Sequence, residues 1–182
     1  MNSIDIMINE HRNISRLIVV IRKMSLNILN NGMIDYNDFY DVINFVRDYA
    51  DKYHHGKEEK ILFKYMVEEC GKVGENMINY GMLLDHDLGR NYIRNLEESV
   101  NLVRLGNKDA RVDVIANAVG YANLLKDHIE KEDNVAYTYA ARTLAKETLE
   151  KIEEQCMEFD KNNYEVQEKY LFILNKLENK YK

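Results

Sequence analysis

Apolar side chains recur every three or four residues along most of the chain, which is the spacing of one face of an α-helix. Ile4, Met7, Ile14, Ile18 and Ile21 form such a stripe near the amino terminus. The same pattern predicts four long helices, over residues 4–29, 36–69, 76–105 and 108–145. Long helices joined by short connections favour an antiparallel, up-and-down four-helix bundle. The predicted fold class is therefore all-α.

Turn-forming residues separate the predicted helices. Gly32 is a candidate left-handed cap after the first helix, and Asp35 is a candidate N-cap of the second. Gly71 and Gly74 bracket a predicted loop before the third helix. The bundle is assigned to residues 1–145, and residues 146–182 are predicted to form a C-terminal pair of helices packed on its outside.

Composition narrows the class of protein. The chain of 182 residues has no proline and only eight glycines, so little interrupts a helix. Its 25 Lys and Arg against 31 Asp and Glu give a net charge of -6, with no dense basic stripe, which argues against a nucleic acid partner. No apolar run approaches the roughly 18 residues of a membrane span, and the two cysteines are isolated. We expect a cytoplasmic, soluble protein without a leader or membrane partner.

Polar side chains interrupt the apolar faces of these helices at similar positions. Each bundle helix contributes one inward histidine, and two helices add a glutamate one turn later: His11, His54 with Glu58, His86, and His128 with Glu132. Buried carboxylates with no inward Lys or Arg cost on the order of several kcal/mol each, and a bound cation removes that cost. Imidazole and carboxylate suit Fe, Mn or Zn, and two bridging glutamates favour two ions. The remaining positive charge would attract hydroxide, oxide or another anion to an exchangeable position.

Each feature has a simpler explanation when it is taken alone. A single inward histidine is more often a hydrogen-bonded core residue, and one HxxxE pair is often a contact on a helix surface. His55 and Glu59 lie toward the flank of their helix, where they are either solvated or close to the site. Tyr121 either packs in the core or reaches the site. The whole set favours a metal site over the alternative of a metal-free helical interaction module.

The motifs resemble those of a known family. They are "EHR" with His11, "HHGKEEKILF" with His54 and Glu58, "MLLDHDLGR" with His86, and "LLKDHIEKEDNV" with His128 and Glu132. Over about residues 5–142 their order and spacing are similar to those of the hemerythrin-like HHE cation-binding family. The resemblance implies a non-haem di-iron centre, in which the four histidines are terminal ligands of two iron ions. Glu58 and Glu132 would be bridges, with room for an oxo or hydroxo group.

Three features depart from the oxygen-carrying members of that family. Arg90 stands four residues after His86, where those members have a second histidine. Their last carboxylate follows its histidine by five residues, the place of Asp133 here, so Asp133 is an alternative to Glu132. The endings "LFK" and "VAYT" lack the usual proline. The lost proline should only let the second and fourth helices run on, whereas the smaller number of core imidazoles argues against simple reversible oxygen carriage.

Several functions are compatible with such a centre. The protein would bind or sense O2, NO or peroxide, with a separate redox or signalling protein as partner. Alternatively it would be a di-iron oxidoreductase that turns over one of these molecules, or an iron donor for the repair of iron centres. The sequence identifies no catalytic residue that separates these functions.

Overall fold

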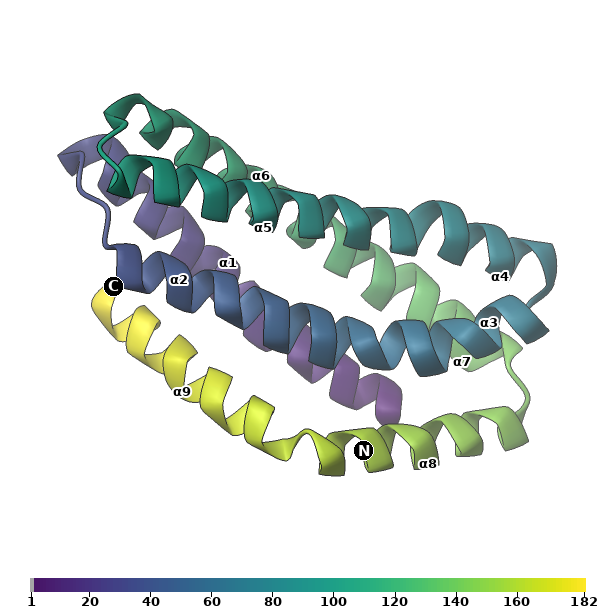
Figure 1. Cartoon of the computed structure of the whole chain (residues 1–182). Helices are drawn as coiled ribbons and strands as arrows, with labels where there is room; N and C mark the ends of the chain where they lie inside the picture. Colours follow the sequence, from purple (N-terminus) through teal and green to yellow (C-terminus); the bar gives the residue numbers. More distant parts are fainter. Residues whose placement is uncertain (1) are drawn as a thin grey trace.

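The computed structural model describes residues 2–182, and every regular element in that part of the chain is helical (Figure 1). The first helix is α1 (Ser3–Asn31). The second long segment consists of α2 (Tyr36–Asn44), η1 (Phe45–His55), η2 (Glu58–Leu62) and α3 (Phe63–Glu69). The third consists of α4 (Gly71–Met77), η3 (Ile78–Met82) and α5 (Leu83–Arg104). The fourth consists of η4 (Lys108–Ala110), α6 (Arg111–Lys131), η5 (Glu132–Ala136) and α7 (Tyr137–Thr143), and α8 (Lys146–Asn162) and α9 (Tyr164–Lys180) follow.

The connections confirm two of the three sequence expectations. Gly32 has a φ of 67° and caps α1, and the Asp35 side chain accepts a hydrogen bond from the backbone N–H of Asn37 at 3.1 Å. The predicted loop between Gly71 and Gly74 is wrong, because α4 begins at Gly71, ahead of the predicted start at residue 76. A side chain at Gly74 would lie 2.7 Å from the carbonyl oxygen of Met66. This glycine therefore permits a close approach of α3 and α4 rather than a loop.

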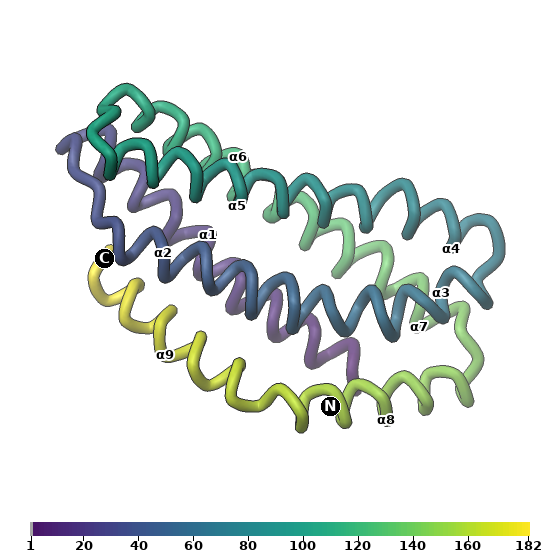
Figure 2. Tube along the Cα trace, in the orientation of Figure 1, coloured from purple at the N-terminus to yellow at the C-terminus, as the bar shows by residue number. Residues whose placement is uncertain are grey.

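The helices pack into a bundle, with α8 and α9 along one side of it (Figures 1 and 2). Helix α9 contacts α1 and η1, and α8 contacts α1 and η2. Near the C-terminus, Lys180 donates to Asp35 at 2.6 Å, which ties the end of α9 to the start of α2. No helix within residues 2–182 is both long and apolar enough to cross a membrane.

The apolar core has two parts, and a polar layer lies between them. One part includes Ile14, Ala50 and Ile93, and the other includes Met7, Leu62 and Met82. Along each of these helices, the two parts bracket a buried histidine in sequence. The fold therefore places the histidines of several helices at one level of the bundle.

The π-helical elements coincide with this polar layer. The element η1 ends at His54 and His55, η2 begins at Glu58, and η5 begins at Glu132. A π-helical turn contains more residues than an α-helical turn, so neighbouring side chains diverge less around the axis. The wider turn explains why His54 and His55 are both buried. The expectation of one inward histidine per helix is therefore wrong for the second helix, which contributes two.

Candidate metal centre

The first cluster consists of His11, His54, Glu58 and Glu132, which come from α1, η1, η2 and η5. All four side chains are buried, and each offers one ligand atom within 4.8 Å of those of the others. The Nε2 of His11 lies 3.1 Å from a carboxylate oxygen of Glu132. The Nε2 of His54 lies 3.7 Å from a carboxylate oxygen of Glu58. These four residues were all singled out in the sequence.

The second cluster consists of His55, His86 and His128, whose ligand atoms also lie within 4.8 Å of one another. The Nε2 atoms of His86 and His128 are 3.1 Å apart. His55 stacks on His86, with ring centroids 3.7 Å apart and an interplanar angle of 7°. His55 therefore lies with the predicted histidines rather than on a solvated flank.

The two glutamates face both clusters. The Nε2 of His86 lies 3.7 Å from an oxygen of Glu58 and 3.6 Å from an oxygen of Glu132. The Nε2 of His128 lies 3.2 Å from Glu132. Both carboxylates therefore stand between the histidines of the first cluster and those of the second, as bridging ligands of two metal ions would.

Several polar atoms at the centre of this layer have no hydrogen-bond partner among residues 2–182. They are Nε2 of His54, Oε2 of Glu58 and both carboxylate oxygens of Glu132. Leaving buried carboxylates without partners is costly in a folded protein. Imidazole nitrogens and carboxylate oxygens that converge in this way are the donor set of divalent transition metals. The residues present therefore fit a bound metal.

Charges within the metal-free layer shift the pKa values strongly. Burial raises the pKa of Glu58 well above the ordinary carboxyl value, and the nearby Glu132 carboxylate raises it further. Burial also opposes ionisation of Glu132, but imidazoles led by His128 outweigh it and hold this pKa well below the ordinary value. Although burial lowers the pKa of His11, the carboxylates of Asp133 and Glu132 raise it to about 10. The carboxylates thus attract positive charge, for which protons and metal ions compete.

Every histidine has a carboxylate at its other ring nitrogen, Nδ1. The pairs and their distances are His11–Asp133 at 2.7 Å, His54–Glu10 at 2.8 Å, His55–Asp51 at 3.4 Å, His86–Glu59 at 2.7 Å and His128–Asp85 at 3.3 Å. Such a partner fixes the ring orientation and leaves Nε2 to bind a metal. Asp133 and Glu59 thus lie behind histidines, whereas Glu132 lies at the centre.

Arg90 does not face either cluster. Its guanidinium pairs with Asp51 at 2.7 Å and with Glu59 at 2.6 Å, the carboxylates behind His55 and His86. The third imidazole of the second cluster comes from His55 instead. A place of His55 close to the site was one of two alternatives open from the sequence, and helical spacing alone does not decide between them, because His55 belongs to another helix than Arg90.

Three further polar residues near the first cluster were not found from the sequence. Tyr137 is fully buried and donates its hydroxyl to Glu58, and its ring stacks on that of His11. Glu10 and Lys57 are also buried and contact each other. The expectation that no Lys or Arg points inward is wrong for Lys57. Its ammonium pairs with Glu10 and Asp160 rather than with Glu58 or Glu132.

A cavity of about 130 Å³ adjoins the second cluster. Its wall contains the three histidines of that cluster together with apolar residues such as Val46, Ile93 and Leu125. Tyr121 also lines it, and the Tyr121 hydroxyl has no hydrogen-bond partner among the residues described. A space of this size holds a molecule of a few atoms.

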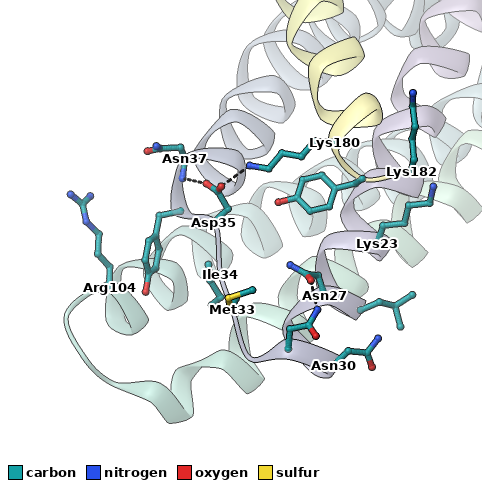
Figure 3. Close-up of a pocket in the computed structure, with 14 residues that line it drawn as sticks. Lys23, Asn27, Asn30, Met33, Ile34, Asp35, Asn37, Arg104, Lys180 and Lys182 are labelled. Carbon is teal, nitrogen blue, oxygen red and sulfur yellow. Dashed lines mark hydrogen bonds and ion pairs between the residues drawn. The ribbon is translucent and has the colours of Figure 1, made fainter.

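A larger cavity of about 870 Å³ lies elsewhere, at the end of the bundle where α1 and α9 finish (Figure 3). Its wall includes Lys23, Asn27, Arg104 and Lys180, and it contains no histidine. Size therefore does not identify the site of chemistry in this chain. The convergent imidazole and carboxylate atoms identify it instead.

The sequence was also compared with known proteins. The profile of the Hemerythrin HHE cation binding domain matches residues 2–140. No curated protein and no solved structure matches the chain significantly. The matched region exceeds half of the 182 residues and includes all seven residues of the two clusters. The chain therefore belongs to the hemerythrin HHE cation-binding domain family.

Proposed function

We propose that this protein holds a non-haem di-iron centre and binds O2 or a related small oxidant, NO or peroxide, at one of the two ions. The first cluster would hold one ion and the second cluster the other, with Glu58 and Glu132 as bridges. The observation that carries this proposal is the pair of buried carboxylates that face both groups of histidines, with three oxygens that have no hydrogen-bond partner among residues 2–182. A single ion would leave part of this donor set without a partner.

The surroundings of the two clusters favour the second one as the place of ligand binding. All three histidines of the second cluster lie in the wall of the 130 Å³ cavity, whereas no histidine of the first cluster does. The wall combines apolar side chains such as Ile93 and Leu125 with charged ones at its rim, and the space suits a small molecule. Iron, when bound, supplies reversible electron transfer and an open coordination position.

We further infer the antiparallel, up-and-down order for the four bundle segments, because short connections such as residues 32–35 and 105–107 join successive segments. We also propose a redox or signalling protein as partner and the cytoplasm as the place of action. These points are extensions of the same proposal.

The test of the proposed function is ligand binding by the iron-loaded protein. The full chain would be loaded with Fe²⁺ under anaerobic conditions and then exposed separately to O2, NO and hydrogen peroxide. We expect the visible absorption to change with at least one of them and not in the His55→Ala variant. Iron binding without any response to the three molecules would contradict the proposed function. Repeated consumption of peroxide or O2 would identify an enzyme rather than a binding protein.

A further inference from the structure

A line of polar contacts runs from the partly exposed Asp160 of α8 to the buried first cluster. An oxygen of Asp160, near the end of α8, accepts a hydrogen bond from Nζ of Lys57 at 2.7 Å. Lys57 also donates to one oxygen of Glu10. The other oxygen of Glu10 lies 2.8 Å from Nδ1 of His54. The line therefore joins a helix outside the family match, which ends at residue 140, to a candidate metal ligand.

Lys57 is the central residue of this line, and its side chain is fully buried. A buried ammonium group is costly unless carboxylates surround it. Glu10 and Asp160 are its carboxylate partners among the residues described, and its Nζ lies 4.3 Å from the ring centroid of Tyr53. Tyr53 in turn donates its hydroxyl to Asp160 at 2.8 Å. Asp160 therefore supplies one of the two negative charges that stabilise the buried ammonium group of Lys57.

Glu10 is shared between Lys57 and His54, one oxygen for each. Without the charge of Asp160, Glu10 would be the only anion left for Lys57, and its carboxylate would be drawn away from the imidazole. A histidine ligand whose Nδ1 partner is disturbed binds its metal about 10- to 100-fold less tightly. The contacts therefore predict an effect of α8 on the first cluster.

The second cluster has no comparable tie to α8. The carboxylates at Nδ1 of its histidines belong to the four bundle segments: Asp51, Glu59 and Asp85. Two of them pair with Arg90, and the third pairs with Lys131. Any effect that passes through Asp160 should therefore be confined to one of the two ions.

We propose that α8 is a positioning element of the metal centre, in which Asp160, acting through Lys57 and Glu10, orients the imidazole of His54. Asp160 is a positioning residue and not a ligand. This inference rests on the two-ion centre proposed above and adds that a helix outside the matched domain controls one of the ions. Movement of α8, by a partner protein or by truncation, would then change one iron position and leave the other intact.

The experiment is a titration of the metal-free full-length chain with Co²⁺, read by visible absorption, for the unchanged protein and for Asp160→Asn. We expect two binding steps for the unchanged protein. In Asp160→Asn, one step should weaken by about 10- to 100-fold while the other keeps its affinity. The step that weakens should be the one that His54→Ala abolishes. Asp160→Glu, which keeps the charge, should recover much of the lost affinity.

The matched control is Glu178→Gln. It removes the ion pair between α9 and Arg16 and leaves the line from Asp160 to His54 intact. We expect this variant to lose some thermal stability and to keep both Co²⁺ affinities. If Asp160→Asn behaves in the same way, Asp160 has only a structural role and the inference is wrong.

A second readout separates this inference from the proposed function. If the unchanged protein binds no Co²⁺, the proposed function is wrong, and the coupling is then measured in the metal-free chain from the ¹⁵N signals of the His54 imidazole. These signals should move in Asp160→Asn and not in Glu178→Gln. Unchanged signals in Asp160→Asn would overturn the inference whatever the metal content.

Discussion

The first and second clusters share two carboxylates but differ in their surroundings. Behind the first cluster lie the buried Glu10 and Lys57, and the Tyr137 hydroxyl is paired with Glu58. Beside the second cluster lies a cavity, and the Tyr121 hydroxyl in its wall has no partner among residues 2–182. This difference is the basis of the proposal that a further ligand binds beside the second cluster.

The carboxylates behind the histidines do not divide between the clusters in the same way. Behind the first cluster, Glu10 is 2% and Asp133 is 30% exposed. Behind the second cluster, Asp85 is 13% exposed, and Asp51 and Glu59 are 26% and 29% exposed. Partly exposed ion pairs with Arg90 hold these latter two, and exposed pairs of this kind contribute little stability.

The largest effect is expected for Glu132→Gln, because this carboxylate serves both clusters. Its Oε2 lies 3.1 Å from His11 Nε2 and 3.2 Å from His128 Nε2, and an amide is a poor bridge between cations. We expect metal analysis to find no bound iron, and we expect the metal-free chain to be less stable than the unchanged one, because the imidazoles that hold the pKa of Glu132 low lose their carboxylate partner. The control Glu97→Gln, which alters a surface pair with Arg47, should keep its iron. Full iron content in Glu132→Gln would show that the two clusters do not depend on a shared carboxylate.

The two adjacent histidines allow the clusters to be separated. His54→Ala removes a ligand of the first cluster, and His55→Ala removes one of the second. We expect each variant to keep one ion, and the Co²⁺ absorption spectra of the two to differ. Only His55→Ala should abolish the response to O2 or NO, because the cavity adjoins that position. Identical metal content and identical ligand response in the two variants would contradict a division into two positions.

Filling the cavity should affect the ligand and spare the metal. Leu125→Phe adds volume to its wall, and overpacking of a confined space costs about 1–3 kcal/mol, which corresponds to a loss of affinity of about 5- to 150-fold. We expect full iron content together with weaker NO binding in a spectroscopic titration. Leu102→Phe, at a side chain that is 46% exposed, is the matched control and should bind NO normally. Normal NO binding by Leu125→Phe would place the ligand elsewhere.

The smallest effect is expected for Tyr121→Phe. The lost hydroxyl has no partner among the residues described, so the free energy of unfolding of the metal-free chain should stay constant or rise by about 1 kcal/mol. Tyr49→Phe is the control, because the Tyr49 hydroxyl accepts a hydrogen bond from Asn13 at 3.1 Å and its loss should cost about 1 kcal/mol. Denaturant unfolding measures both values. Equal destabilisation of the two variants would show that Tyr121 has a partner in the folded chain.

Much of this arrangement follows from the periodicity of the sequence. The long helices were predicted because their apolar stripes are regular, and His11, His54, His86 and His128 were found because each interrupts such a stripe. The structure places all four inside the polar layer. Residues on a regular helical face can therefore be assigned to a buried site from spacing alone.

Other features could not be predicted, for two physical reasons. Two places, solvated or close to the site, stayed open for His55, because α-helical spacing puts it on the flank, whereas the π-helical turn brings it inward. Lys57 escaped because it pairs with Asp160, more than a hundred residues away in sequence, and Glu10 escaped because its partners, Lys57 and His54, lie on another helix. Gly74 was misread because a glycine signals either a turn or a close approach, and only packing distinguishes the two.

The central claim is that five histidines and two glutamates hold two ions, and that both glutamates serve both ions. The most direct measurement is the iron content per chain of the unchanged protein, purified anaerobically from iron-supplemented cells without a chelating tag. The account predicts two iron ions per chain, one for each cluster. A chain that contains no metal, or one zinc ion at saturation, would contradict it.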